Sequence, residues 1–349
     1  MNHHRLPVPP CVGAFPLLLA ALLAPSDVAA QADLATSRID SVFADLDVEY
    51  SPGCALGVWR EGDLAYTRGY GYANLDHRIP ITDETVFGIG STSKQFTAAA
   101  VVLAAQRGQL SLNDDIRRWI PEFPTYERPI TLRHLVHHTS GIRDDAQLRA
   151  VGNLPGLGPE QVVDLLARQQ ALNFPPGERH LYSNSGYVLL AVIVERATGR
   201  PLRDLVKEEL FAPLGMDATM FKRSNAIVPL GATGYWPVEG AFIVRSRADA
   251  ENIGAGGAFS SVDDFSRWIT MLAEDGPDDD FRQAMLEEGA LVSGEKLDYA
   301  FGLSTGTHRG VPVIYHGGAE NGYRAGFILY PTEDLAVVAF CNLATVDAQ

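Results

Sequence analysis

The sequence predicts an α/β fold in which strands from both ends of the chain form one sheet and the middle of the chain forms a helical insertion. Apolar and polar residues alternate over residues 54–70 and again after residue 299, a pattern typical of strands. The sequence pattern of residues 110–250 predicts mostly helices and loops. The chain has 349 residues, of which 46% are hydrophobic, so it is long enough for a large core.

Residues 1–30 have the features of an export signal. Arg5 precedes an apolar run from Phe15 to Ala24, and small residues suited to cleavage follow at positions 28–32. The run is shorter than the roughly 20 apolar residues of a spanning helix, so we expect a cleaved signal rather than an uncleaved anchor. The mature protein would then have no stable membrane span and would be periplasmic or secreted.

The sheet domain is expected from two separate parts of the chain, residues 33–90 and 251–349. Within the first part, residues 33–48 carry apolar side chains at helical spacing. The expected strands cover residues 54–59, 64–70, 299–306, 311–316, 323–330 and 335–342. Two helices are expected before the later strands, at residues 259–273 and 280–288.

The helical domain is expected to cover residues 91–250. Its first helix is Ala-rich and covers residues 91–106. Two further helices are predicted at residues 160–171 and 185–198. The last of these lies between an asparagine and a glycine, residue types that favour the two ends of a helix.

The charge of the chain restricts its partners. The formal net charge is −15, and removal of residues 1–30 leaves it unchanged because Arg5 and Asp27 cancel. An acidic surface repels nucleic acid and anionic lipid. We therefore expect no nucleic-acid partner, whereas the oligomeric state is left open.

Two cysteines, Cys54 and Cys341, lie in strand-like runs. They are too few for a disulfide scaffold, and no Cys-x-x-Cys spacing suggests a metal site. We favour the interpretation that both are small buried hydrophobic residues. A single bridge between them in an oxidising compartment is the alternative.

Ser91-Thr-Ser-Lys94 is the first candidate catalytic motif. Residues three apart share a helix face, so the Lys94 amine can reach the Ser91 hydroxyl. A desolvated lysine can accept the proton of a serine nucleophile, and a helix N-terminus stabilises developing negative charge. A second Ser-x-x-Lys at residues 293–296 lies in a loop with no helix after it, so nothing fixes its geometry.

Tyr182-Ser-Asn184 is the second candidate, in a Pro- and Gly-rich loop before a helix. Tyr182 could relay protons if neighbouring cations lower its pKa. Asn184 could hydrogen-bond Lys94 and a substrate amide. Another Tyr-x-Asn, at residues 72–74, follows a predicted strand and is more consistent with a turn.

His316-Gly317-Gly318 is the third candidate. Glycines beside a strand let a substrate approach the backbone closely, and His316 would line the pocket. A second His-x-Gly at residues 308–310 is more consistent with a hairpin turn.

In this order, the three motifs resemble the signature elements of the serine β-lactamase and penicillin-binding family, which includes class C β-lactamases, D-Ala-D-Ala carboxypeptidases and esterases. Residues 87–96, 132–141 and 174–184 are similar to the family's nucleophile segment, its histidine-containing loop and its second element. The resemblance extends over about residues 35–343. It implies a β-lactamase/transpeptidase-like three-layer α/β sandwich, with an antiparallel sheet flanked by helices and an inserted all-helical domain.

The resemblance also implies the roles of the catalytic groups. Ser91 would be acylated, and Lys94 and Tyr182 would share the proton transfers. The backbone N–H groups of Ser91 and Ala319 would form the oxyanion hole, which helps most when negative charge develops. Water would then release the acyl group, with no metal and no cofactor.

The remaining motif residues would bind and support the substrate: Asn184, His316, Gly317 and Gly318. One departure is that β-lactamases of class C usually have lysine where this chain has His316, which is charged only part of the time near neutral pH. This favours esters or peptides over β-lactams. Another is that the family usually ends in a helix on the sheet, for which the residues up to Gln349 are too few.

Three competing interpretations are weaker. Residues 302–306 match the Gly-x-Ser-x-Gly motif of α/β-hydrolases, but no helix follows the serine and no acid and histidine follow it in the required order. His134, His137 and His138 have no carboxylate or cysteine set that would complete a zinc site, so we expect them to hydrogen-bond loop backbone. A catalytically silent, penicillin-binding-like protein is the non-enzyme alternative.

The sequence thus predicts an exported serine hydrolase that acts through an acyl-enzyme on Ser91. Its partner would be a small acyl substrate, with a carboxylic ester or a D-Ala-type peptide preferred. Hydrolysis of β-lactam amides is the alternative. The motifs do not rank these substrates further, because loops set the shape of the pocket.

Overall fold

The computed structural model describes residues 36–46, 49–153, 156–223, 226–245, 253–273 and 279–348. The expected export signal lies outside these residues. The chain divides into two compact units, Met1–Asp45 and Leu46–Gln349. In the first unit, residues 36–42 are helical. The second unit holds everything discussed below, and the described part of the chain contains no helix of the length and hydrophobicity that crossing a bilayer requires.

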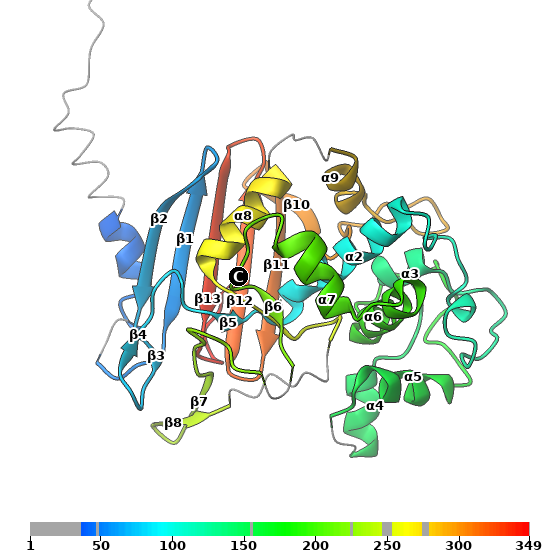
Figure 1. Ribbon diagram of the computed structural model, residues 1–349, viewed down its shortest axis with the longest axis horizontal. Coiled ribbons are helices and arrows are strands. Elements are labelled where there is room, and N and C mark those ends of the chain that lie inside the picture. Colours follow the sequence, from blue (N-terminus) through cyan, green and yellow to red (C-terminus); the bar gives the residue numbers. More distant parts are fainter. Residues whose placement is uncertain are drawn as a thin grey trace, which may run out of the picture. The chain divides into compact units, whose positions relative to one another are not determined.

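A six-stranded antiparallel sheet is the centre of the second unit, with the order β10-β11-β12-β13-β1-β2 (Figure 1). Two of its strands come from the start of the chain and four from the end, and they meet where Cys54 lies opposite Cys341. The strands are β1 (Cys54–Arg60), β2 (Asp63–Tyr70), β10 (Ser304–His308), β11 (Val311–Glu320), β12 (Tyr323–Tyr330) and β13 (Leu335–Cys341). This arrangement confirms the predicted α/β fold with an antiparallel sheet.

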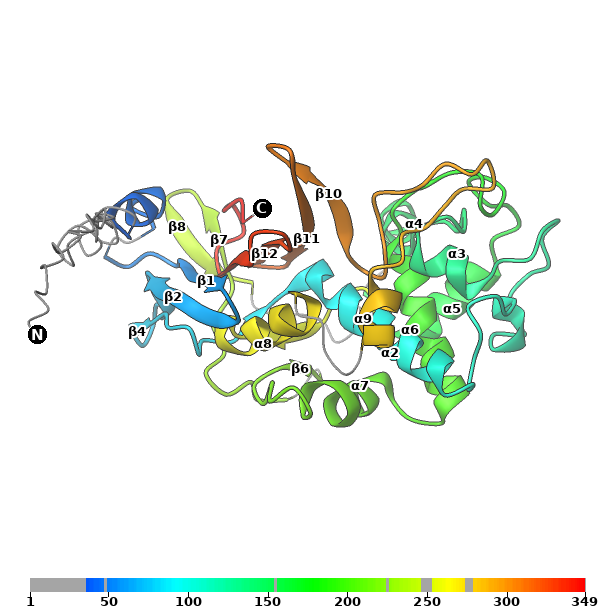
Figure 2. The ribbon, with the colours of Figure 1, turned by 90° about the horizontal axis from the view of Figure 1, so that it is seen from above.

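The helices fall into two groups (Figures 1 and 2). Near the sheet lie η1 (Gly90–Ser93), α2 (Lys94–Gln106), α8 (Val262–Ala273) and α9 (Asp279–Met285). The helical region contains η2 (Ile116–Arg118), α3 (Leu132–Val136), α4 (Asp145–Gly152), α5 (Pro159–Ala167), α6 (Asn184–Thr198), α7 (Leu202–Val206) and the π-helical turn η3 (Lys207–Phe211).

Short strands complete the fold. They are β3 (Tyr72–Asn74) with β4 (Ile79–Pro80), β5 (Phe87–Gly88) with β9 (Ala258–Ser260) and β6 (Met220–Phe221), and β7 (Tyr235–Val238) with β8 (Ala241–Val244). The β5–β9–β6 sheet matters for the site, because β5 ends just before η1 and so fixes where α2 begins.

Helix α2 is buried all round and joins the sheet to the helical region (Figure 2). Phe96 packs edge-on against Phe211 on one side and against Trp268 of α8 on the other. The Trp268 indole donates a hydrogen bond to Gln95. A helix that is apolar on every face is stable only inside a core, so the start of α2 has a rigid environment.

Helix α8 covers one face of the sheet. Phe265 lies 5.3 Å, between ring centroids, from both Phe327 of β12 and Phe340 of β13. These three aromatic side chains are buried. Helix α8 therefore contacts both β12 and β13 through Phe265 and α2 through Trp268. Because β11 is the neighbour of β12 in the sheet, these contacts fix the position of β11 relative to α2.

Two predicted strands have different bounds in the structure. The strand expected at 299–306 begins only at Ser304, because Gly302 adopts a φ of +72° in a tight turn. A Cβ at this glycine would lie 2.5 Å from the backbone nitrogen of Gln95, so only glycine fits. The strand expected at 311–316 continues to Glu320, which places the His-Gly-Gly motif inside β11.

Cys54 and Cys341 are joined by a disulfide between the adjacent strands β1 and β13. Both residues are fully buried, so that part of the favoured interpretation is correct. Their sulfur atoms are nevertheless bonded to each other, and the alternative of a single bridge therefore describes the structure. The bridge connects the two ends of the chain that build the sheet.

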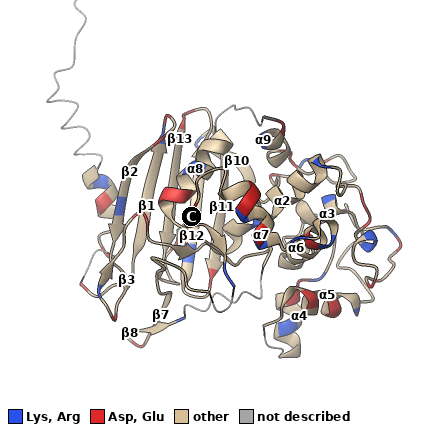
Figure 3. Ribbon diagram, in the orientation of Figure 1, with Lys and Arg blue, Asp and Glu red and all other residues tan. Residues whose placement is uncertain are grey.

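Acidic and basic residues are scattered along the ribbon (Figure 3). Several arginines of the helical region pair with carboxylates there. Arg196 contacts Glu122 and Glu160, each at 2.8 Å, and Arg200 contacts Glu208 at 2.6 Å. These arginines are thus neutralised locally, in keeping with the acidic balance of the chain.

Candidate active site

Ser91 is the second residue of η1, directly before α2. The preceding Gly90 has a φ of +51°, and a Cβ there would lie 2.7 Å from the backbone nitrogen of Ala319. A Cβ at Gly318 would lie 1.9 Å from the carbonyl oxygen of Ile89. Glycines at both positions therefore let η1 pack against the backbone of β11, which places Ser91 beside that strand.

Lys94 is fully buried and makes three hydrogen bonds. Its Nζ donates to Ser91 Oγ at 3.0 Å, to Asn184 Oδ1 at 2.9 Å and to the carbonyl oxygen of Ala255 at 2.7 Å. An ammonium group has three protons, so these acceptors satisfy it completely. The acceptors come from η1, from α6 and from the segment before β9, so three distant parts of the chain meet at one amine.

Burial lowers the pKa of Lys94 to about 7. The negative charges of Asp144 and Glu320 oppose this shift but do not cancel it. Near neutral pH the amine is therefore neutral for much of the time. A neutral lysine 3.0 Å from a hydroxyl can accept its proton.

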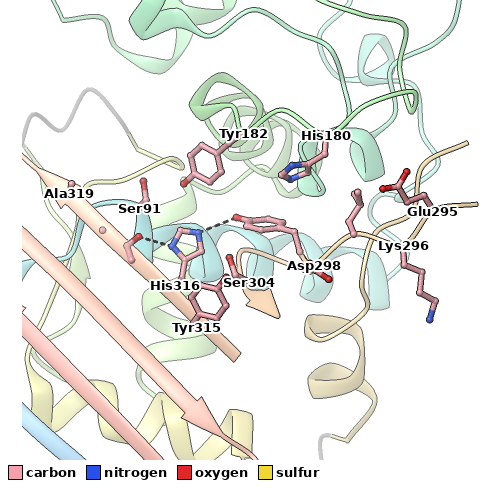
Figure 4. A pocket seen from close by; sticks show the side chains of 14 residues that line it. Ser91, His180, Tyr182, Glu295, Lys296, Asp298, Ser304, Tyr315, His316 and Ala319 are labelled. Atoms are coloured by element: carbon pink, nitrogen blue, oxygen red, sulfur yellow. Dashed lines mark hydrogen bonds between the residues drawn. The ribbon is translucent and has the colours of Figure 1, made fainter. Parts of the chain in front are cut away.

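The hydroxyl end of Tyr182 points toward Ser91 (Figure 4). Lys94 Nζ lies 4.8 Å from the centre of its ring. Withdrawal from water raises the pKa of Tyr182, although a hydrogen bond with Ser91 acts in the opposite direction. The condition that neighbouring cations lower this pKa is therefore not met, because desolvation of the phenolate and the charge of Asp144 both raise it. The phenol keeps its proton at neutral pH.

Asn184 is the first residue of α6, and its backbone is hydrogen-bonded to Asp144. Its backbone N–H donates to Asp144 Oδ2 at 2.7 Å, while Asp144 Oδ1 caps α4 by accepting from the N–H of Ala146 at 3.0 Å. Asp144 is a supporting residue that was not expected from the sequence. The signal that could have found it is an aspartate just before a helix, the residue type favoured at an N-cap.

His316 lies in β11 and is buried. Its Nδ1 is 2.7 Å from the carbonyl oxygen of Gly317, so Nδ1 must carry the proton, and Nε2 then accepts from the Tyr299 hydroxyl at 3.3 Å. Burial, and after it the charge of Lys94, lowers the pKa of His316 to about 4. The imidazole is therefore neutral near pH 7 and offers no fixed positive charge.

Comparison with known proteins decides the family. Residues 39–349 match the beta-lactamase family. The chain belongs to this family. Its relatives include a D-aminopeptidase from Gluconobacter oxydans, 29% identical over 89% of this chain and 59% of that protein. Penicillin-binding protein 4* of Bacillus subtilis is 32% identical over 84% of the chain and 68% of that protein.

A solved structure agrees with the fold of this beta-lactamase-family chain. The octameric penicillin-binding protein homologue from Pyrococcus abyssi superimposes with a TM-score of 0.77, at 26% identity, over 92% of this chain and 75% of that one. The chain spans about three fifths of the length of the D-aminopeptidase relative. Taken together, these similarities show a chain of the beta-lactamase family with the fold of that penicillin-binding protein homologue.

A pocket of about 610 Å³ opens at Ser91 in this chain (Figure 4). Its walls come from η1, the loop before α6, the loop before β10, and β11. They are lined by Ser91, His180, Tyr182, Glu295, Lys296, Leu297, Asp298, Tyr299, Ser304, Tyr315, His316, Gly317, Gly318 and Ala319. Among the described residues that line it, Lys296 is the one lysine or arginine, and Figure 4 shows its amine pointing away from Ser91. The structure thus gathers every predicted site residue in or beside one pocket.

The competing motifs lack the geometry of the Ser91 site, although Lys296 and Ser304 also line the pocket. Ser293 is exposed and accepts a hydrogen bond from the N–H of Glu295 at 3.4 Å. Ser304 begins strand β10 and is followed by no helix. His134 Nδ1 accepts from the N–H of Thr131 at 3.1 Å and so caps α3. Within the described ranges, no three side chains of His, Cys, Asp or Glu gather where they could hold a metal ion.

Proposed function

We propose that this chain hydrolyses small acyl substrates through an acyl-enzyme on Ser91, with carboxylic esters or D-Ala-type peptides preferred. One observation carries the proposal: the buried Lys94 amine, with a pKa of about 7, lies 3.0 Å from the Ser91 hydroxyl at the end of an open pocket. Lys94 acts as the base and Ser91 as the nucleophile, which is the arrangement that serine activation requires.

Acylation follows from this geometry. Neutral Lys94 takes the Ser91 proton as Oγ bonds to the acyl carbon, and the Tyr182 phenol hands a proton to the leaving group as its bond to that carbon breaks. Tyr182 regains a proton from Lys94, whose amine is neutral again. The backbone N–H groups of Ser91 and Ala319 hold the oxyanion. Water then attacks the acyl carbon by the same proton route and frees Ser91.

The supporting residues fit these roles. Asn184 accepts from Lys94 at 2.9 Å and so keeps the amine aimed at Ser91. Gly317 and Gly318 expose the backbone of β11 to the pocket. The neutral His316 gives a substrate carboxylate no charged partner, which favours neutral esters and peptides. Hydrolysis of β-lactam amides is the second candidate, favoured by the family of the chain.

Export and domain division belong to the same proposal. We place the mature protein in the periplasm or outside the cell, with residues 1–30 as a signal peptide. The Cys54–Cys341 disulfide supports this, because such bonds persist in oxidising compartments. We further propose that residues 33–90 and 251–349 form the sheet domain and residues 91–250 the helical domain, with the site between them.

A substrate panel tests the proposal. We expect p-nitrophenyl acetate, D-alanine p-nitroanilide and a D-Ala-D-Ala peptide with an amidated C-terminus to be turned over faster than nitrocefin, since nitrocefin carries a carboxylate that His316 cannot neutralise. The measurement is kcat/KM for each substrate with the purified mature protein. Faster hydrolysis of nitrocefin would establish the β-lactamase candidate instead. Binding of all four without turnover would indicate a silent binding protein.

The rate of ester hydrolysis should depend on pH through Lys94. Below about pH 7 the amine is protonated and cannot accept the Ser91 proton, so kcat/KM should rise with pH and reach half its maximum near 7. Glu320 supports the charged amine, so Glu320→Gln should lower this pKa and shift the rise to lower pH. A pH–rate profile that is flat from pH 5 to 9, or unmoved by the substitution, would contradict a lysine base.

A further inference from the structure

His138 is a buried histidine that the proposed reaction leaves without a role. It follows α3, is 1% exposed, and has a φ of +56°, a backbone region that residues other than glycine rarely adopt. Its ring centre lies 4.3 Å from that of Tyr182. The histidine therefore lies directly behind the phenol that faces Ser91.

Two hydrogen bonds tie His138 to the residues on either side of Tyr182. The N–H of Leu181 donates to the His138 carbonyl oxygen at 2.9 Å. The N–H of Ser183 donates to His138 Nδ1 at 3.2 Å. Both peptide neighbours of Tyr182 are thus fixed by one residue. The loop is held further along the same segment, where the N–H of Gly177 donates to the Thr139 carbonyl oxygen at 2.8 Å.

The protonation of His138 keeps this arrangement intact. Because Nδ1 accepts a hydrogen bond, the ring proton of the neutral form lies on Nε2. Burial, and after it the charge of Lys94, holds the pKa of His138 well below its usual range, so the ring stays neutral. Among the described residues, Nε2 has no hydrogen-bond partner.

A requirement for stability alone does not explain this side chain. A buried N–H without a partner costs free energy of folding, and an apolar side chain of similar size would avoid that cost. What an apolar side chain would not provide is the acceptor for Ser183 N–H. The acceptor at Nδ1 is therefore the property that requires histidine here.

We propose that His138 is a positioning residue, which aims the Tyr182 phenol at Ser91 through its hydrogen bonds to Leu181 and Ser183. The proposal rests on the role of Tyr182 in the proposed function. The geometry requires an acceptor at the position of Nδ1, whereas the position of Nε2 is dispensable. A displacement of about 1 Å in a proton-relaying group can reduce a rate by about 100-fold.

A pair of amide substitutions separates the two ring positions. In His138→Asn the amide oxygen can take the place of Nδ1, and asparagine tolerates a positive φ. In His138→Gln the amide lies one bond further out, near the place of Nε2. We expect kcat for p-nitrophenyl acetate to stay within about threefold of wild type in His138→Asn and to fall about 10- to 100-fold in His138→Gln, with KM nearly unchanged. Equal rates in the two variants would overturn the proposal.

A double-mutant cycle shows whether the effect passes through Tyr182. Once Tyr182→Phe has removed the hydroxyl, His138→Gln should slow kcat by less than about twofold further. A further 10-fold loss in that background would overturn the proposal but leave the role of Tyr182 intact. If Tyr182→Phe alone left kcat unchanged, the proton relay itself would fail, and this proposal with it.

His137→Leu is the matched control, because His137 is a buried neighbour that packs on Phe301 rather than on Tyr182. We expect its kcat to remain within about twofold of wild type, provided thermal denaturation shows a folded protein. A loss of kcat in His137→Leu equal to that in His138→Gln would show a general effect of disturbing this segment and would overturn the proposal.

Discussion

Replacing Ser91 with alanine is expected to abolish ester turnover, with kcat reduced about 10⁴-fold or more. The substitution removes the Ser91 hydroxyl, which is the group that Lys94 Nζ contacts at 3.0 Å. Without this hydroxyl no acyl-enzyme can form. Two measurements check this: the initial rate with p-nitrophenyl acetate, and the mass of the protein after treatment with a fluorophosphonate. The wild type should gain one adduct on Ser91, and Ser91→Ala should gain none.

Ser293→Ala is the control for this prediction, because Ser293 belongs to the second Ser-x-x-Lys of the chain but is exposed in a loop. We expect wild-type rates and a normal adduct in this variant. Ester hydrolysis that survives Ser91→Ala, or an adduct on Ser304, which also lines the pocket, would reject Ser91 as the nucleophile.

The sequence predicted the Ser91–Lys94 pair because its geometry is local. Two residues three apart at the start of a helix have only one way to face each other, and the helix was evident from its composition. The strands at both ends of the chain were likewise evident from alternation, and the pairing of neighbouring strands follows from the short turns between them. The pairing of β1 with β13, which joins the two ends in one sheet, is long-range.

The contacts of Tyr182, Asn184 and His316 with this pair are long-range, and no local pattern determines them. Asn184 lies 90 residues from Lys94 along the chain. The context of each second copy indicated a loop or a turn, but the roles of these residues were assigned through the family resemblance. The folded chain then brings Ser91, Tyr182 and His316 into the walls of one pocket.

Other features depend on packing that a sequence does not show. The carbonyl oxygen of Ala255 receives the third proton of Lys94, and a backbone atom carries no signal in the residue type. The direction of the pKa shift of Tyr182 depends on a balance between desolvation, which raises the pKa, and the hydrogen bond with Ser91, which lowers it. The extent of β11 past His316 was underestimated, because glycines usually indicate a turn and here they allow close contact with η1.

Substitution of Lys94 should have the second largest effect on the rate. We expect Lys94→Met to lower kcat for esters by about 10²- to 10⁴-fold, the usual contribution of a general base. Methionine fills a similar volume but cannot take the Ser91 proton. The measurement is single-turnover acylation by p-nitrophenyl acetate, which reports on the step that needs the base and does not depend on product release.

Lys94→Arg separates the base from its charge. A guanidinium keeps the positive charge near Ser91 and Asn184, but it stays protonated at every accessible pH and so cannot act as a base. If Lys94 works by accepting a proton, arginine should be about as slow as methionine. If it works only as a fixed charge, arginine should retain much of the rate. Because the amine lies in a fully buried site, each variant must first show a cooperative thermal transition. A folded Lys94→Arg protein with more than about a tenth of the wild-type acylation rate would contradict the role of Lys94 as the base that activates Ser91.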